Sequence, residues 1–141
     1  MGKRTEEPGL KPPRIPNQRA IVDRRALAER IAAAVADAGA AKARPQVVEL
    51  LRGALAAGRA EIAQRLAERP SAGHDCAEAQ AFLTDQLIRL IYDHVTHDVY
   101  PANNRSTGER LTIMAVGGYG RGEMAPHSDV DIAFITPGKQ T

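Results

Sequence analysis

The stretch AVGGYGRGEMAPHSDVDIAFI, residues 115–135, brings a pair of glycines and a pair of aspartates close together in the sequence. Before the glycines, residues 111–116 (LTIMAV) form a short apolar run with β-branched members, which predicts a buried strand. After the glycines, residues 129–136 (DVDIAFIT) predict a second strand that is closed by a Pro-Gly pair. Ten residues separate the glycine pair from the first aspartate, a length that fits a turn and a short helix between two strands.

Asp129 and Asp131 are the candidate metal ligands. Because they are two residues apart in the second predicted strand, their carboxylates are expected to project from the same face. Two like charges held so close repel each other, and a divalent cation would remove this conflict. Carboxylate oxygens suit Mg²⁺, so the pattern predicts a magnesium site. On the opposite face, Val130, Ile132 and Phe134 are expected to anchor the strand in a core.

Gly117 and Gly118 are the candidate phosphate-binding residues. Glycine lets the backbone turn sharply and approach a ligand closely, with N–H groups presented to phosphate oxygens. A short helix that starts after the pair would add its positive end to this attraction. Each motif alone is a weak signal, since Asp-x-Asp is commonly a solvated turn and a glycine-rich turn is commonly only a turn. Both motifs at this spacing, each beside a strand, favour a nucleotide-binding site.

The rest of the chain has a different, helical pattern. Residues 1–19 contain four prolines and several charges without periodicity, and they predict a disordered, basic and Pro-rich tail. Residues 20–109 predict an amino-terminal helical region, and residues 110–141 predict the start of a catalytic domain that is truncated. The first helix is expected from about residue 20 to Gly39, with an apolar stripe made by Leu27, Ile31 and Val35.

Two further helices are expected. One begins near Pro45, because proline is tolerated in the first helical turn. Gly53 and Gly58 weaken this helix, which is expected to bend or break there. The next helix is expected to have Asp75 as its amino-terminal cap, with a glutamate three residues later as the capping-box partner, and to end before Pro101.

Composition excludes several classes of protein. The formal net charge of +2 is too small to indicate a nucleic-acid partner. No run approaches the ~18 apolar residues of a membrane span, and no apolar signal core is present, so no membrane partner is expected. The single cysteine, Cys76, cannot form an internal disulfide, which favours a reduced, cytoplasmic protein. His94 and His97 share a helix face but lack a third metal ligand.

The motifs also carry a family resemblance. Gly-Gly, ten residues and Asp-x-Asp resemble the signature of the polymerase-β-type nucleotidyltransferase superfamily. The longer string GGYGRGEM-x-P-x-SDVD resembles the catalytic motif of the bacterial PII uridylyltransferase/uridylyl-removing family, whose usual form has Leu in place of Met124. The family that adenylylates glutamine synthetase shares the Gly-Gly and Ser-Asp-x-Asp parts but lacks the Gly-Arg-Gly-Glu run. The match covers residues 115–135, and the helical region agrees only in general character.

The resemblance implies an activity for this site. Asp129 and Asp131 would hold two Mg²⁺ ions that bridge the triphosphate of UTP, while Gly117 and Gly118 would contact its phosphates. A tyrosine hydroxyl of the nitrogen-regulatory PII protein would attack the α-phosphate, and pyrophosphate would leave. Ser128 is a further candidate for a phosphate contact.

Several side chains near the motif keep more than one interpretation. Ser128 either contacts phosphate or caps the local turn. Arg121 either donates two hydrogen bonds to the triphosphate or pairs with Glu123 and fixes the loop. Tyr119 is expected to pack rather than react, and His127 is expected to lie in solvent.

The resemblance also implies parts that these residues lack. Superfamily members add a third carboxylate from a later strand, and family members continue into a phosphohydrolase domain and glutamine-sensing domains. We therefore expect an α+β fold: amino-terminal helices followed by the first two strands of an incomplete polymerase-β-type nucleotidyltransferase domain. The isolated 141 residues are expected to be inactive. The alternatives are an adenylylating relative or a non-catalytic, truncated helical interaction module.

Overall fold

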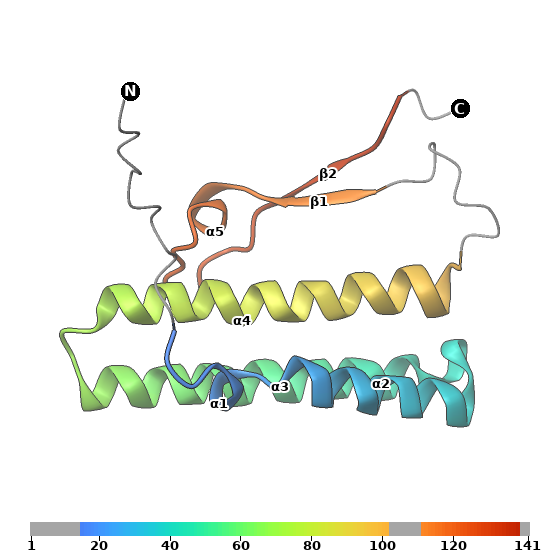
Figure 1. The fold of residues 1–141 in the computed structure, drawn as a ribbon, viewed down its shortest axis with the longest axis horizontal. Helices are drawn as coiled ribbons and strands as arrows, with labels where there is room; N and C mark the ends of the chain where they lie inside the picture. The colour runs from blue at the N-terminus through green and yellow to red at the C-terminus, as the bar shows by residue number, and fades with distance from the viewer. Residues whose placement is uncertain (1–14, 102–110, 139–141) are drawn as a thin grey trace, which may run out of the picture.

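The computed structural model describes residues 15–101 and 111–138, and its fold is α+β, as the sequence predicts (Figure 1). Four α-helices and a π-helical turn come first, and a two-stranded sheet with a short helix between its strands follows. In chain order the elements are α1 (Gln18–Ile21), α2 (Arg24–Ala38), α3 (Ala40–Glu68), α4 (Gly73–His94), η1 (Val95–Val99), β1 (Thr112–Ala115), α5 (Gly117–Gly120) and β2 (Ile132–Ile135).

Helix α4 forms the middle layer of the molecule, with α1, α2 and α3 on one side and the β1–β2 hairpin on the other (Figure 1). The sequence of α4 explains this position because it carries two apolar stripes at helical spacing. One stripe enters the main core and includes Cys76, Ala79, Leu83, Leu87 and Leu90. The other stripe lies on the opposite side of the helix and contacts the hairpin through Ala81 and Ile88.

Helix α2 has the carboxyl end and the apolar stripe that the sequence predicts, but it begins at Arg24 instead of near residue 20. The Asp23 side chain caps its first turn by accepting a hydrogen bond from the Ala26 N–H at 3.0 Å. Gly39, with φ of 81°, ends the helix. Leu27 and Ile31 are buried in the main core. The predicted start near residue 20 holds instead the separate short helix α1.

Helix α3 differs from the prediction. It begins at Ala40, contains Pro45 in its second turn, and continues unbroken for 29 residues. The expected break at Gly58 is absent because packing outweighs the weak helix propensity of glycine. A Cβ atom at Gly58 would lie 2.6 Å from Leu83 Cδ1 and 2.9 Å from the Ile21 carbonyl oxygen. The missing side chain therefore lets α1 and α4 approach α3 closely.

The start of α4 also corrects the prediction. The helix begins at Gly73 after Ala72, and Asp75 lies inside its first turn rather than at the cap. The Asp75 carboxylate instead pairs with Arg69, with Oδ2 2.8 Å from Nη2. At its other end the helix passes into η1, and the helical structure stops before Pro101, as expected.

The predicted tail, residues 1–19, is ordered in its last part. Residues 1–14 lie outside the described residues, as do residues 102–110 of the predicted connection. Ile15 packs against the main core, and the Arg65 guanidinium donates hydrogen bonds to the carbonyl oxygens of Pro16 and Asn17 at 2.7 and 3.0 Å. The packed region therefore includes residues 15–17. Ile15 contacts the main core, and Arg65 on α3 binds backbone nearly fifty positions earlier in the sequence.

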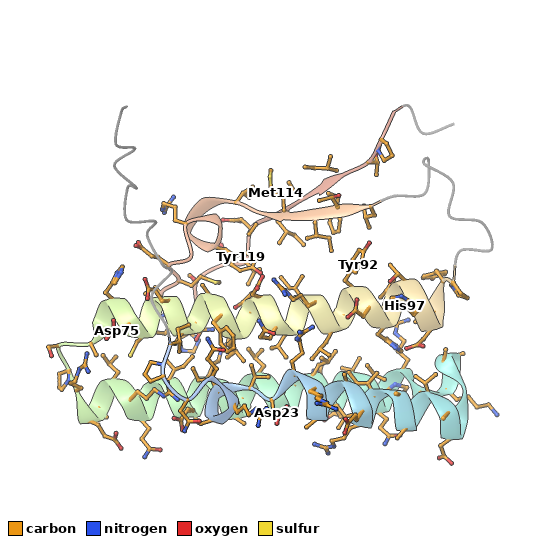
Figure 2. All side chains as sticks on the ribbon, viewed as in Figure 1. Asp23, Asp75, Tyr92, His97, Met114 and Tyr119 are labelled. Carbon is orange, nitrogen blue, oxygen red and sulfur yellow. The ribbon has the colours of Figure 1, made fainter. Side chains whose placement is uncertain are left out.

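Strands β1 and β2 pair in antiparallel register, with Thr112 opposite Ile135 and Ala115 opposite Ile132. The expectation that both strands are buried is wrong. Only one face of the hairpin meets α4, so Met114 on the other face is 46% exposed, and Phe134, at the open end of the hairpin, is 62% exposed. Figure 2 shows Met114 on the side of the hairpin away from α4. Within the described residues, no helix has both the length and the apolar character to cross a membrane.

Candidate active site

Asp131 and Gly117 lie against each other at the end of the hairpin. The Val116 N–H donates a hydrogen bond to the Asp131 carbonyl oxygen at 3.1 Å, which extends the strand pairing by one residue. Gly117 has φ of +62°, a conformation that favours glycine. A Cβ atom at Gly117 would lie 3.1 Å from Asp131 Oδ2, so the carboxylate occupies the space beside the glycine. The expected closeness of a glycine of the pair and an aspartate is confirmed here.

Asp129 and Asp131 are both exposed, but they precede β2 instead of lying in it. The predicted strand 129–136 is shorter because pairing as a regular ladder begins at Ile132. Val130 consequently does not anchor the strand and is 45% exposed, whereas Ile132 packs toward α4. Among the described residues, no group of three or more His, Cys, Asp or Glu side chains is arranged to hold a metal ion. Two carboxylates are thus the candidate donor set within this part of the chain.

The turn that holds the glycine pair is the four-residue helix α5, which begins at Gly117 itself. Close backbone packing explains its other glycines. A Cβ atom at Gly118 would lie 3.0 Å from the Glu123 carbonyl oxygen, and one at Gly120 would lie 2.8 Å from the Ala115 carbonyl oxygen. Any side chain at these positions would force the backbone of the turn to move.

Arg121 lies beside the glycine pair. Its Nη2 atom is 3.7 Å from the position that a Cβ atom of Gly118 would take. The alternative interpretation, an ion pair with Glu123, is not formed in the described part of the chain. Glu123 Oε1 instead lies 3.8 Å from His74 Nδ1 on α4. The guanidinium is therefore free of that carboxylate and adjacent to the predicted phosphate-binding backbone.

Ser128 and His127 are both exposed, and His127 has φ of 63°. The Ser128 N–H donates a hydrogen bond to the Ala125 carbonyl oxygen at 3.1 Å, but its hydroxyl forms no hydrogen bond with the described residues. The predicted cap by the Ser128 side chain is thus not formed. The exposure of His127 confirms that this side chain lies in solvent.

Tyr119 anchors α5 on α4. Its ring is 7% exposed, and its hydroxyl donates a hydrogen bond to Asp85 Oδ1 at 3.2 Å. Burial raises the pKa of Tyr119 to about 12, and the neighbouring Asp85 carboxylate adds to this increase. Figure 2 shows Tyr119 between the hairpin and α4, and Tyr92 reaching from α4 toward β1. The expectation that Tyr119 packs is confirmed.

Sequence reasoning missed the residues of α4 that hold the turn. Besides Asp85, the Ala77 carbonyl oxygen accepts a hydrogen bond from the Met124 N–H at 3.1 Å, and the Met124 side chain is buried. A signal was present, because Ala77, Ala81, Asp85 and Ile88 follow one another at helical spacing on the side opposite the main core.

The two histidines and the cysteine that the sequence analysis considered make contacts within the helical region. His94 Nδ1 pairs with Asp98 Oδ2 at 2.9 Å, whereas His97 Nδ1 hydrogen-bonds to the Asp93 carbonyl oxygen at 2.9 Å. The two histidines therefore use separate partners. Cys76 is buried in the main core, where its sulfur lies 3.9 Å from the Ile62 carbonyl oxygen.

Comparison with known families agrees with this geometry. Residues 103–141 match the nucleotidyltransferase domain family. This segment includes the glycine turn, both aspartates and the hairpin. The candidate site thus lies in a segment that matches the nucleotidyltransferase domain family.

Curated relatives narrow the family. Over 129 residues, or 92% of this chain, the chain is 70% identical to the bifunctional uridylyltransferase/uridylyl-removing enzyme of Novosphingobium aromaticivorans. It is 56% identical to the protein of the same name from Erythrobacter litoralis and 47% identical to that from Rhodospirillum rubrum. The chain is related to the bifunctional uridylyltransferase/uridylyl-removing enzymes and spans about 14% of their length. No solved structure matches it.

Proposed function

We propose that this chain forms part of the active site of a uridylyltransferase that transfers UMP from UTP to a tyrosine of the nitrogen-regulatory PII protein. The observation that carries the proposal is the position of the Asp131 carboxylate against Gly117, at the turn between the two strands. The identity to named uridylyltransferases supports UTP as the nucleotide. The PII protein as the partner and a cytoplasmic location are parts of the same proposal.

The two aspartates fit a magnesium site. Both carboxylates are exposed, their oxygens are the ligands that Mg²⁺ prefers, and the missing side chain of Gly117 lets the Asp131 carboxylate lie against the glycine turn. In this proposal Asp129 and Asp131 hold Mg²⁺. When bound, the metal stabilises negative charge that develops on the phosphates.

The remaining residues bind and orient the triphosphate. Gly117 and Gly118 lie in the first turn of α5, where helical N–H groups have no carbonyl partner within the helix and can donate to phosphate oxygens. Arg121, which lies beside Gly118, is placed to donate two hydrogen bonds to a phosphate, and the free Ser128 hydroxyl adds another donor. The oxygen of the acceptor hydroxyl attacks the α-phosphorus of UTP and gives up its proton. The bond between the α-phosphorus and the pyrophosphate oxygen breaks, and pyrophosphate leaves.

Replacement of both aspartates tests the proposal. In a protein of the relatives' length that contains this chain, Asp129→Asn together with Asp131→Asn should lower the rate of UMP transfer to PII by about a thousandfold or more. The charge is lost while the side-chain volume is kept, so thermal unfolding should change little. Glu29→Gln on the exposed face of α2 is the control and should transfer UMP at the unaltered rate.

Two results would contradict the proposal. Transfer at the unaltered rate by the double variant would remove the aspartates from the reaction. A preference for labelled ATP over labelled UTP would identify the adenylylating alternative. Loss of transfer with UTP as the preferred nucleotide would support the uridylyltransferase.

A further inference from the structure

The turn that carries the glycine pair needs contacts with other elements to keep its conformation. Helix α5 has only four residues, and a helix of one turn is unstable without outside contacts. Three of its four residues are glycines, which offer no side chain for packing. Tyr119 is the buried residue of this helix, so the position of the turn depends on how that side chain is held.

Two kinds of contact hold Tyr119. The ring packs with Ala81 of α4 and with Met124 in a small apolar cluster. The hydroxyl donates its hydrogen bond to Asp85 Oδ1 at 3.2 Å, which connects positions 34 apart in sequence. A hydrogen bond to a carboxylate is stronger than one between neutral groups, and it fixes the direction in which the ring points.

Asp85 is itself oriented by a second partner. Its Oδ2 atom lies 3.3 Å from Arg89 Nε, one helical turn later on α4. One carboxylate oxygen therefore faces the tyrosine hydroxyl, and the other faces the guanidinium. The Asp85–Arg89 pair is about half exposed and contributes little stability by itself, but it restricts the rotation of the carboxylate.

We propose that Asp85 is a positioning residue for nucleotide binding: through Tyr119 it holds the Gly117–Gly118 backbone in place to receive the triphosphate. This inference rests on the proposed function of the glycine pair. Gly118 precedes Tyr119 directly, so a rotation of the tyrosine anchor displaces the N–H groups of the pair. Asp85 lies outside residues 103–141, which match the nucleotidyltransferase domain, so a helix that precedes this segment controls the shape of its nucleotide site.

The protonation state of Tyr119 agrees with this role. Burial, with the Asp85 carboxylate as the next cause, raises the pKa of Tyr119 to about 12. A tyrosine hydroxyl is already protonated in the neutral range, and the raised pKa keeps the Tyr119 hydroxyl a donor at alkaline pH as well. Loss of the Asp85 acceptor would leave a buried hydroxyl without its partner, which weakens the anchor.

The test separates nucleotide binding from turnover. In the protein of the relatives' length, Asp85→Ala and Tyr119→Phe should each raise the KM for UTP and the Kd for UTP with Mg²⁺ by roughly five- to tenfold. The kcat should change less than about twofold, because neither residue touches the reacting atoms. The variant with both changes should bind UTP no more weakly than either single variant, since each change breaks the same hydrogen bond.

Conservative and distant variants provide the controls. Asp85→Asn keeps an oxygen acceptor of the same shape and should restore most of the affinity for UTP. Glu29→Gln, far from the turn on α2, should bind UTP as the unaltered protein does. If Asp85→Ala lowers the thermal unfolding temperature, Tyr119→Phe decides the outcome, because it removes only the hydroxyl and keeps the packed ring.

Each outcome has a definite meaning. Unchanged affinity in Tyr119→Phe, or losses that add in the double variant, would overturn the positioning role of Asp85. If the aspartate variants at positions 129 and 131 abolish transfer while the Asp85 variants bind UTP normally, the proposed function stands and only this inference fails. If the aspartate variants transfer UMP normally, the proposed function fails first.

Discussion

The helical layers and the hairpin differ in how they are packed. Among the described residues, thirteen buried residues from α1–α4 and their connections form one continuous core, whereas the cluster beneath the hairpin has three. Phe134, Ile135 and Met114 remain largely exposed. The more extensively packed part of the described chain is therefore the helical part, and the candidate site lies on a thin element that depends on α4 for its position.

The largest expected effect is a loss of stability when a core residue of the helical layers is truncated. Leu83→Ala should lower the free energy of unfolding by about 2–5 kcal/mol, because Leu83 of α4 is fully buried and packs against Gly58 of α3. Phe134→Ala, an equally drastic truncation on the hairpin, should cost less than about 1 kcal/mol because the ring is 62% exposed. Urea denaturation followed by circular dichroism measures both, and equal losses would contradict the division into a packed and an unpacked region.

A smaller effect is expected in the turn. Gly120→Ala should destabilise the hairpin by about 1–3 kcal/mol, since the new Cβ would lie 2.8 Å from the Ala115 carbonyl oxygen. Hydrogen exchange should become faster at the Val116 and Gly120 amides and stay unchanged in α3. The matched control is Gly53→Ala, where no atom beyond the surrounding helix backbone lies within 4 Å of the new Cβ, and the helix should gain up to about 1 kcal/mol. Equal exchange at the hairpin amides in Gly120→Ala and the unaltered chain would show that the turn tolerates a side chain.

The smallest effect concerns pH. The pKa of Tyr119 is raised from 10.0 to about 12 in the folded chain, so the folded state holds this proton more tightly than the unfolded state. The stability that Tyr119 contributes is fully present below pH about 10 and is lost as the pH rises toward about 12. Tyr119→Phe should consequently show a shallower loss of stability over this range in denaturation measured at several pH values. Identical slopes for the two proteins would mean that burial does not protect the phenol.

The sequence predicted the elements better than their limits. Apolar periodicity correctly indicated α2, α4 and both strands. The prediction failed in α3, because the helix propensities of Pro45 and Gly58 favoured a late start and a break. Close packing of Leu83 on Gly58 decided the outcome, and that contact joins residues whose proximity no local pattern contains.

The candidate site shows the same division between local and distant information. The spacing of the motif predicted that the glycine pair would lie beside the aspartates, and Asp131 does lie beside Gly117 because both residues adjoin strands that pair with each other. The partner of Tyr119 could not be predicted in this way, since Asp85 belongs to a helix that ends long before β1 begins. The magnesium, phosphate and acceptor roles of the site residues remain predictions.

The two opposite stripes of α4 make the number of residues in this helix as important as their identity. Leu83 enters the main core, and Asp85, two positions later, meets the glycine turn. One residue inserted between Leu83 and Asp85 would rotate the second stripe by about 100° relative to the first. The helix thus sets the angle between its core-facing residues and its residues that meet the glycine turn, and a change in length there would misalign the turn even if every side chain were kept.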